Sequence, residues 1–466
     1  MRIVHKFGGM ALSTGARVRQ AGRLIAKHRE STLAVVVSAM GDTTDALAAA
    51  CDRSAAGDVA YVQRFVRDIE RRHGQAMNAA VTDRKRQRQV AQALAAKGDQ
   101  LSRVLTGMAY LGEVTPKSRD FVLSFGERLS ADLLWGALTD LGVKVQRYTG
   151  AEAGIVTDSN YGEAHPLLDA TYHQVQQTLA SPLGAKRIAV VTGFIAADQH
   201  GNVTTLGRGG SDYTASILGA ALKADEIWLW TDVDGILSTD PRIVTEARLI
   251  PAVSFQEALE LAVLGAKALH PRAFEPAMVA GVPVRIRNCF KPDIAGTRIV
   301  KSQRVEKGRI VKVVMPVWNV ALVTVSGASM VGAPGTAATV FRVMGEQRVN
   351  IMMISQSVSE SNISMIIPRT SRPRAVNALE LALVSRGIVN QVTYEDDVCV
   401  LGAVGAGMKG TPGVAARLFG ALARRGINVR MIAQGSSELN ISLVVRETDG
   451  KEAVRAIHQE FALGRD

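Results

Sequence analysis

The sequence predicts an α/β protein with a largely parallel central sheet, followed by two copies of a βαββ module. Short runs of β-branched and aliphatic residues alternate with helix-periodic segments over residues 1–304, and such alternation is typical of a parallel sheet covered by helices. Glycine-rich or polar strings follow several of these runs. From residue 305 onward the chain repeats itself at a constant spacing, which indicates a duplicated module.

The composition is that of an ordinary soluble globular chain. Of the 466 residues, 47% are hydrophobic and 21% are charged, which argues against disorder and fibrous classes. No apolar run is long enough to cross a membrane. Three cysteines suit a reducing compartment, and the N-terminus shows no secretion signal. We therefore expect a cytoplasmic protein without a membrane partner.

The net charge of +12 suits either nucleic acid or an anionic substrate such as a nucleotide. The densest basic cluster, at residues 84–88, lies in a helix-like stretch without interleaved aromatic residues. We interpret this cluster as a solvated helix face and expect no nucleic-acid partner.

The elements of the first domain follow in a regular order. A β-branched run at residues 2–7 predicts a strand that ends on the glycine pair Gly8-Gly9. The further predicted strands are 33–37, 143–145, 188–192 and 227–230, and the predicted helices are 14–28, most of 42–140, 211–223 and 255–268. Because parallel sheets hold their ligands at the carboxyl ends of the strands, we expect the site in the loops that follow them.

The second half of the prediction rests on the repeat. The string Met330–Gly335 matches Met408–Gly413, and 349–351, 354–356 and 362–364 match 427–429, 432–434 and 440–442, always with an offset of 78. Each copy reads strand, Gly-Pro loop, helix, strand, strand, and two such units can pack as a pair. The predicted domains are therefore 1–304, 305–390 and 391–466.

Two strings are typical of phosphate binding. Lys6 ends a strand beside Gly8 and Gly9, where bare backbone lets phosphate oxygens approach N–H groups and Lys adds a positive charge. The string 204–212 surrounds Arg208 with glycines and opens a helix with Gly210, Ser211 and Asp212, so free N–H groups and a guanidinium can hold an anion. The first string is a weak signal on its own, and the alternative for the second is a Ser or Asp helix cap on a flexible loop.

Other polar strings stay ambiguous on their own. Thr231 and Asp232 follow a strand and suit a ribose or phosphate, or form only a turn. Glu127 binds an ammonium group or completes a helix cap. Lys267 reaches phosphates or neutralises a helix end. His270 is interpreted as a structural, hydrogen-bonding histidine.

Taken together and in this order, the strings resemble the aspartate kinase family, and the match covers nearly the whole chain. The family-like strings are 36–41 with 43–44, 124–130, 191–196 with 204–212, 231–242, 267–271 and 296–297, and the repeats resemble paired ACT modules. No segment resembling homoserine dehydrogenase follows the second repeat, so the resemblance is to monofunctional members.

The resemblance implies an amino-acid-kinase fold, ATP with Mg²⁺, and phosphorylation of the β-carboxylate of L-aspartate, the first step of lysine, threonine and methionine biosynthesis. It implies that Lys6 and Asp212 are catalytic. The implied phosphate or ATP ligands are Lys6, Gly8, Gly9, Gly210, Ser211, Thr231, Asp232, Arg242 and Lys267. The implied aspartate ligands are Ser38, Thr44, Glu127, Arg208 and Ser211. No protein ligand is assigned to the metal.

One departure keeps alternatives open. The family usually reads Gly-Gly-Thr-Ser after the Lys, whereas this chain has Met10 and Ala11 after its glycines. The alternatives are a kinase for another amino-acid carboxylate, and a weakly active amino-acid sensor on the same scaffold.

The resemblance to ACT modules also implies feedback control by an amino acid and a homodimer or homotetramer formed through these modules. The implied effector ligands are Met330, Gly335, Asn350, Gln356, Asn428 and Gln434. The Ile-Ser-Gln and Ile-Ala-Gln strings resemble threonine-controlled members more than lysine-controlled ones.

Overall fold

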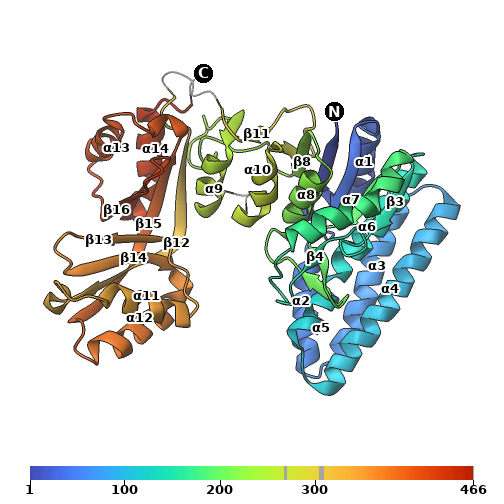
Figure 1. The fold of residues 1–466 in the computed structure, drawn as a ribbon, viewed down its shortest axis with the longest axis horizontal. Coiled ribbons are helices and arrows are strands. Elements are labelled where there is room, and N and C mark those ends of the chain that lie inside the picture. Colours follow the sequence, from blue (N-terminus) through green and yellow to red (C-terminus); the bar gives the residue numbers. More distant parts are fainter. Residues whose placement is uncertain (267–269, 304–308, 465–466) are drawn as a thin grey trace. The chain divides into compact units, whose positions relative to one another are not determined.

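The computed structural model describes residues 1–266, 270–303 and 309–464 (Figure 1). The chain divides into two compact units. The first comprises Met1–Ile236, Pro251–Phe255 and Ala268–Ser302, and the second comprises Leu237–Ile250, Gln256–Lys267 and Gln303–Asp466.

The first unit is built on an eight-stranded sheet with the order β3-β5-β2-β1-β8-β10-β11-β9. Its strands are β1 (Ile3–Phe7), β2 (Thr32–Val37), β3 (Val145–Tyr148), β5 (Ile188–Thr192), β8 (Glu226–Thr231), β9 (Ala252–Ser254), β10 (Val284–Asn288) and β11 (Thr297–Val300). Every neighbouring pair is parallel except β10–β11. The predicted parallel sheet is therefore confirmed.

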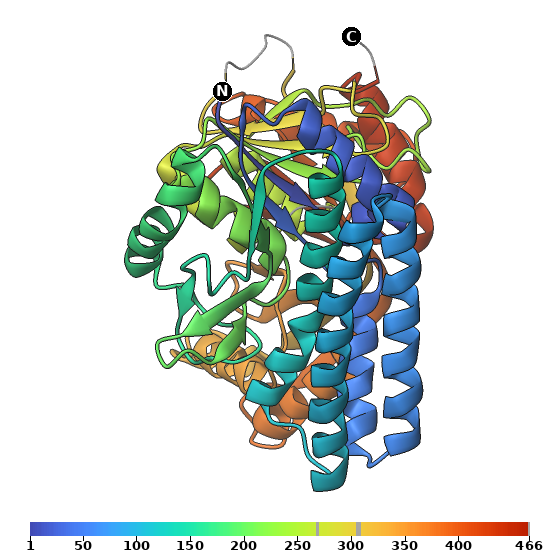
Figure 2. The ribbon, with the colours of Figure 1, turned by 90° about the vertical axis from the view of Figure 1, so that its right-hand side faces the viewer.

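Helices cover both faces of this sheet (Figure 2). On one side lie α1 (Gly15–Lys27), α2 (Thr43–Ala55), α3 (Val59–Ala80), α4 (Arg84–Leu111), α5 (Pro116–Leu123) and α6 (Phe125–Asp140); on the other lie α7 (Leu168–Gly184), α8 (Gly210–Ala221) and α10 (Glu275–Ala280). Residues of α1, α3, α4 and α6 form one hydrophobic core with β1 and β2. Residues 84–88 lie in the first turns of α4, mostly on its exposed side.

Local details differ from the sequence expectations. The strand predicted at 143–145 begins only at Val145, because the N–H of Val143 still bonds to the Leu138 carbonyl at the end of α6. Helix α9 (Phe255–Val263) is shorter than predicted, since Gly265 takes a left-handed φ of 84° soon afterwards. The three-stranded sheet β4 (Val156–Thr157), β6 (Ile195–Asp198) and β7 (Val203–Thr205) was not predicted.

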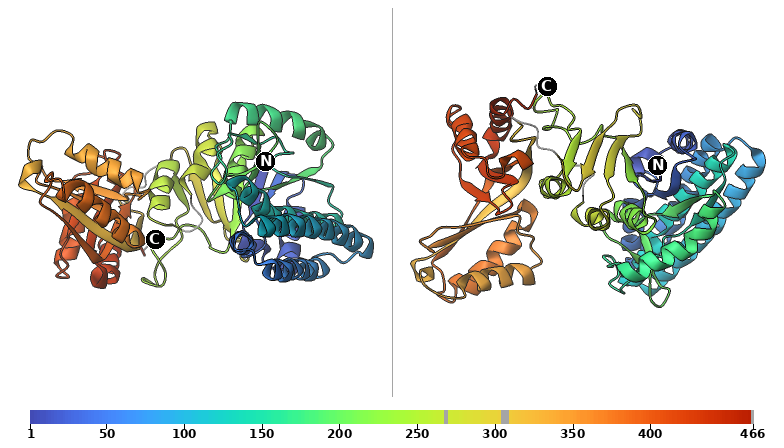
Figure 3. Two further views of the ribbon diagram at one scale, coloured as in Figure 1. Left: turned by 90° about the horizontal axis from the view of Figure 1, so that it is seen from below. Right: turned by 45° about the horizontal axis from the view of Figure 1, so that its top comes forward.

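The second unit contains a six-stranded antiparallel sheet with the order β13-β14-β12-β15-β17-β16. The first copy of the repeat comprises β12 (Val313–Ser326), α11 (Thr336–Glu346), β13 (Met353–Gln356), β14 (Asn362–Pro368) and α12 (Arg372–Leu379). The second comprises β15 (Gln391–Val404), α13 (Val414–Ala423), β16 (Met431–Gln434), β17 (Asn440–Arg446) and α14 (Gly450–Glu460). Each copy thus has the predicted βαββ order and one further helix. Figure 3 shows the helices of the first copy in orange and those of the second copy in red; each pair packs on its own part of the sheet and forms a separate core with it.

The two copies share their long first strands. The end of β12 pairs with β14 and the start of β15, whereas the start of β12 pairs with the end of β15, with Val313 opposite Val404. Each module therefore includes half of the other module's long first strand. The predicted boundary between residues 390 and 391 does not account for this exchange. The predicted cut between 304 and 305 lies outside the described residues.

A segment from the first predicted domain belongs to the second unit. The buried carboxylate of Glu257 on α9 accepts the Ala406 N–H at 2.7 Å and lies 3.1 Å from the Lys312 ammonium. These two contacts of Glu257 explain why most of α9 belongs to the same unit as the repeats.

No helix within the described ranges is long and apolar enough to span a membrane. The three cysteines are buried and unpaired.

Candidate active site

A cavity of about 720 Å³ opens at the carboxyl ends of β1, β2 and β5 in the first unit. It brings together nine predicted residues from widely separated strings: Lys6, Gly9, Ser38, Thr44, Glu127, Arg208, Gly210, Ser211 and Asp212. The position of the cavity agrees with the expectation for a parallel sheet.

Lys6 and Asp212 form the charged pair of this cavity. Lys6 lies on the central strand β1, opposite Val36 and Leu229, and its Nζ is 2.6 Å from Asp212 Oδ1. Both side chains are largely shielded, with exposed fractions of 13% and 17%. The pair holds the ammonium group at the end of the strand, where an incoming anion meets it.

The loop after β1 is held close to its neighbours. The Gly8 N–H donates to the Trp230 carbonyl at 3.1 Å. A Cβ at Gly9 would lie 2.9 Å from the carbonyl oxygens of both Ala39 and Gly41, so only glycine fits there.

The glycine-rich loop leads into α8 without a side-chain cap. Gly207 and Gly209 take left-handed φ values of 71° and 75°, and the helix begins at Gly210 with no capping bond from a side chain. The alternative of a Ser or Asp cap is therefore wrong. The N–H groups of Gly210 and Asp212 donate to the Gly207 and Gly209 carbonyls, whereas the Ser211 N–H has no partner among the described residues. Arg208 lines the cavity with an exposed side chain and makes no ion pair with any described residue.

Glu127 on the first turn of α6 is the buried carboxylate of the cavity. Its side chain is nearly inaccessible, and Oε1 accepts the Ala39 N–H at 3.1 Å. Oε2 has no hydrogen-bond partner among the described residues. Burial raises the pKa of Glu127 to about 8, against the opposing effects of the Ala39 N–H and the Lys6 charge. Because Ala39 lies on another segment, the helix-cap interpretation of Glu127 is wrong.

Asp120 on α5 is a cavity residue that the sequence reasoning missed. It accepts the N–H groups of Gly162 and Thr205, each at 2.9 Å, and the Thr205 hydroxyl at 2.8 Å. Burial raises its pKa, and these hydrogen bonds oppose that shift. Asp120 thereby joins three walls of the cavity. An acidic residue on the buried side of α5, near Val122, was the available signal.

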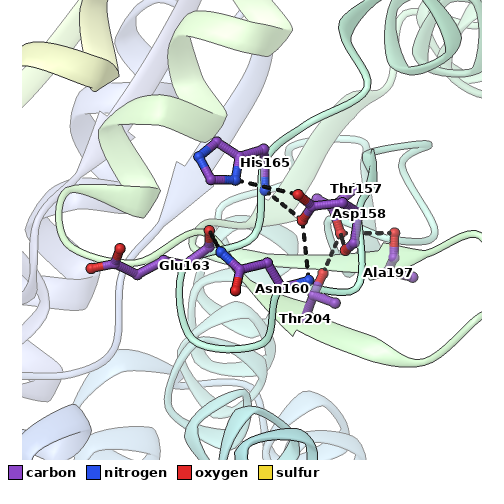
Figure 4. Close-up of polar contacts among 7 residues, drawn as sticks. All are labelled: Thr157, Asp158, Asn160, Glu163, His165, Ala197 and Thr204. Carbon is purple, nitrogen blue, oxygen red and sulfur yellow. Dashed lines mark hydrogen bonds and ion pairs between the residues drawn. The ribbon is translucent and has the colours of Figure 1, made fainter. Parts of the chain in front are cut away.

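The loop of residues 158–165 forms one of these walls (Figure 4). Asp158 accepts the N–H groups of Asn160 and His165, and the Asn160 amide donates to the Glu163 carbonyl. The His165 Nδ1 lies 3.3 Å from Asp158 Oδ2. These bonds fix the loop tip, where Gly162 borders the cavity with a φ of 94°.

Three residues predicted for the nucleotide, Thr231, Asp232 and Arg242, do not line this cavity. Thr231 and Asp232 lie at the end of β8, next to the carbonyl that holds Gly8, and the Thr231 hydroxyl donates to Asp232 at 3.1 Å. Arg242 belongs to the second unit, where it pairs with Asp240 at 2.6 Å. Lys267 lies outside the described residues.

The residues that follow Lys267 partly differ from expectation. His270 packs against Gly209, and its Nδ1 is buried without a partner among the described residues, so the expected hydrogen bond is not made at this atom. Met10 and Ala11 stand where the family usually has two hydroxyl residues, and Ser13 is the next hydroxyl along the chain. Its hydroxyl bonds to Arg17 and the Met10 carbonyl and does not line the cavity, so it does not take their place. In the described part of the chain, no three His, Cys, Asp or Glu side chains gather as a metal-binding group.

A smaller cavity of about 320 Å³ lies in the first copy of the repeat. It brings together Met330, Gly335 and Gln356 but not Asn350, which is exposed elsewhere. Glu360, which was not predicted, also lines it and accepts the Gly332 N–H at 3.0 Å. The second copy repeats this bond between Glu438 and the Gly410 N–H at 2.7 Å, and its Asn428 and Gln434 are exposed.

Comparisons with known proteins agree over the whole chain. The sequence model of the amino acid kinase family matches residues 1–288, and the ACT domain matches residues 323–383 and 401–461. The chain is 32% identical to aspartokinase 1, chloroplastic, of Arabidopsis thaliana, covering 98% of this chain and 80% of the relative. It is 33% identical to the bifunctional aspartokinase/homoserine dehydrogenase 1 of the same plant, and spans about half of that protein's length.

Solved structures show the same fold. Aspartokinase III of E. coli in complex with lysine and aspartate superposes with a TM-score of 0.81, at 25% identity over 99% of both chains. Aspartate kinase of Clostridium acetobutylicum superposes with a TM-score of 0.79, at 24% identity, covering 98% of this chain and 99% of that one.

Proposed function

The chain belongs to the amino acid kinase family and, within it, to the aspartokinases, and from this we propose that it transfers the γ-phosphoryl group of ATP to the β-carboxylate of L-aspartate. The products are ADP and 4-phospho-L-aspartate.

The unpartnered Oε2 of Glu127 carries this proposal. A buried carboxylate with one free oxygen recognises a cation. The same cavity presents Arg208, a guanidinium that can grip a carboxylate with two parallel bonds. An ammonium on Glu127 and an α-carboxylate on Arg208 are the two ends of an amino-acid head group. Ser38 and Thr44 then line the space for the side chain.

The chemistry asks little of the protein beyond position and charge. The acceptor carboxylate is ionised at neutral pH and needs no general base. One of its oxygens attacks the γ-phosphorus in line, and the bond to the β-phosphate oxygen breaks. Lys6 neutralises charge on the transferring group, assisted by the main-chain N–H groups of Gly9 and of Ser211 in the first turn of α8. The N–H groups of Gly8 and Gly210 already donate to the carbonyls of Trp230 and Gly207, so these glycines act by leaving room for the phosphate. Asp212 orients Lys6.

We assign the nucleotide to Thr231 and Asp232 at the end of β8, and Mg²⁺ is brought in as part of the ATP substrate. Asp212 is the carboxylate that reaches the phosphate end of the cavity. These roles rest on the family resemblance.

A second candidate keeps the reaction and changes the acceptor. Met10, half exposed, and buried Ala11 stand where the family usually has two hydroxyl residues. A kinase for another amino-acid carboxylate, or a weakly active sensor, would retain the head-group contacts and differ in acceptor dependence.

We further propose that an amino acid, threonine rather than lysine, regulates the enzyme through the repeats, which join the chains as a homodimer or homotetramer. The cavity of the first copy offers main-chain groups of Met330 to Gly335 and the Gln356 amide to such an effector. E. coli aspartokinase III was solved with lysine, so threonine and lysine are the pair to compare. A cytoplasmic location agrees with the buried, unpaired cysteines.

The test is to measure ATP consumption with L-aspartate, L-glutamate and no acceptor, and to trap the acyl phosphate with hydroxylamine. Consumption that depends on aspartate supports the proposal. Consumption that depends on glutamate, or that ignores the acceptor, would favour the alternatives.

A further inference from the structure

A second cavity of the first unit, of about 480 Å³, lies at the edge of the sheet opposite the active site. It opens at the amino ends of β2, β3 and β5, whereas the active-site cavity opens at the carboxyl ends. Its rim carries four cations, Arg29, Lys144, Lys186 and Arg187.

The parallel register brings these cations together. Val145 on β3 lies opposite Ile188 on β5, so the preceding residues Lys144 and Arg187 begin neighbouring strands. The Ile188 N–H donates to the Lys144 carbonyl at 2.9 Å. Neighbouring strands are about 4.8 Å apart, so the two cationic side chains leave the backbone side by side.

Lys186 holds an unusual backbone conformation beside them. Its φ is 51°, in the left-handed region that non-glycine residues rarely adopt. The turn is held because the Lys186 N–H donates to the Leu183 carbonyl and the Arg187 N–H to the Pro182 carbonyl. This turn directs a third cation to the rim of the cavity.

The positive charge at this rim is not balanced by the protein. The single acidic lining residue, Glu30, lies 3.5 Å from Arg29. Lys144, Lys186 and Arg187 form no ion pair with residues in the described ranges, and all three are exposed. Like charges gathered around a concave surface repel one another and focus a positive potential, which an anion of high charge relieves.

We propose that this cavity binds a polyphosphate group, either the phosphates of a nucleotide or free pyrophosphate. Three convergent cations match several negative charges on a short chain of oxygens. Leu33, Val143 and Leu183 line the interior and offer apolar surface to an attached base. This site is additional to the proposed ATP site, because it lies at the other edge of the sheet.

The test uses the full-length protein and two charge-matched triple variants. The first carries Lys144→Glu, Lys186→Glu and Arg187→Glu in the cavity. The control carries Lys85→Glu, Arg86→Glu and Arg88→Glu on α4. Pyrophosphate binding, measured by calorimetry without Mg²⁺, should weaken about tenfold or more in the cavity variant and much less in the control. The same comparison in a Lys6→Ala background removes the contribution of the active site.

The number of ADP molecules bound per chain shows whether the polyphosphate belongs to a nucleotide or is the free anion. Two ADP sites per chain, one of them lost in the cavity variant, would assign the site to a nucleotide. Pyrophosphate binding without a second ADP site would assign it to the free anion. The proposal is overturned if the cavity and α4 variants lose pyrophosphate binding equally, or if neither loses it. A milder variant with alanine at the three positions, with unchanged kinase turnover, shows that the fold is intact.

Discussion

The active-site cavity and the cavity of the first repeat are built with the same local device. In each, a glycine with left-handed φ, Gly209 at 75° and Gly335 at 89°, precedes a helix that lacks a side-chain cap. The start of each helix then borders a space of amino-acid or phosphate size. The cavities differ in charge. The first adds Lys6, Asp212 and the buried Glu127, while the second offers main-chain groups, the Gln356 amide and one carboxylate, Glu360, which already accepts the Gly332 N–H.

This difference separates recognition from chemistry. We expect the uncapped helix end and the glycine loop of the first repeat to hold the proposed effector. Phosphoryl transfer additionally requires fixed charges that act on the transition state in a partly dehydrated space. Substitutions in the two cavities should therefore change different measured quantities.

The largest effect is expected for Lys6→Ala. It removes the charge that meets the transferring phosphoryl group, so kcat should fall about 100-fold or more. Lys85→Ala on the exposed side of α4 is the matched control and should leave turnover unchanged. A Lys6→Ala enzyme with native kcat would contradict the assigned role.

The next effect is expected for Arg208→Lys. A lysine keeps the charge but cannot form two parallel bonds, so the KM for aspartate should rise about 10- to 100-fold while the KM for ATP changes much less. Steady-state kinetics with each substrate varied in turn measures this split. Equal losses for both substrates would remove Arg208 from the head-group site.

Glu127→Gln tests the buried charge of the active-site cavity through the free energy of unfolding. The folded-state pKa of about 8 lies above the ordinary value of 4.5. Neutral Glu127 thus contributes stability that is fully present below about pH 4.5 and is lost as the pH rises towards 8. Without ligands, the Gln variant should be more stable than the native chain by about 4 kcal/mol at pH 8 and nearly equal at pH 4.5.

Denaturant unfolding at the two pH values measures this difference. A Gln variant that is less stable at pH 8 would mean that Oε2 has a partner in the unliganded protein. The same variant should bind aspartate weakly, because a neutral amide replaces the carboxylate that faces the ammonium group.

The smallest effect is expected in the cavity of the first repeat. Gln356→Ala should leave kcat unchanged and raise the threonine concentration for half-maximal inhibition about tenfold. Gln434→Ala makes the same change in the second copy and tests whether both copies respond. If neither threonine nor lysine alters the rate or the thermal midpoint of the native chain, the repeats are structural.

Residue strings at strand ends were the most informative part of the sequence. Nine of the predicted residues meet in one cavity because parallel strands place their following loops at one edge. The 78-residue offset likewise predicted two copies with the same internal order. Both successes rest on local patterns whose spatial consequence is simple.

Pairings between distant segments were not predictable in the same way. Asp120 reaches Gly162 and Thr205, which lie 42 and 85 positions away, and no local pattern marks such a bond. The exchange of half-strands between β12 and β15 depends on register shifts near Val317 and Val320. Asn350 follows the repeat faithfully but does not reach the cavity of its own module.

We propose above all that the charges of the active-site cavity, at the carboxyl ends of the parallel strands, act on the carboxylate of aspartate. The most direct measurement is the rate of hydroxamate formation from ATP and hydroxylamine with aspartate, with glutamate and without acceptor, for the native chain and Lys6→Ala. The account predicts product with aspartate alone, and a loss of about 100-fold or more in the variant. Equal product with glutamate, or a variant as active as the native chain, would contradict it.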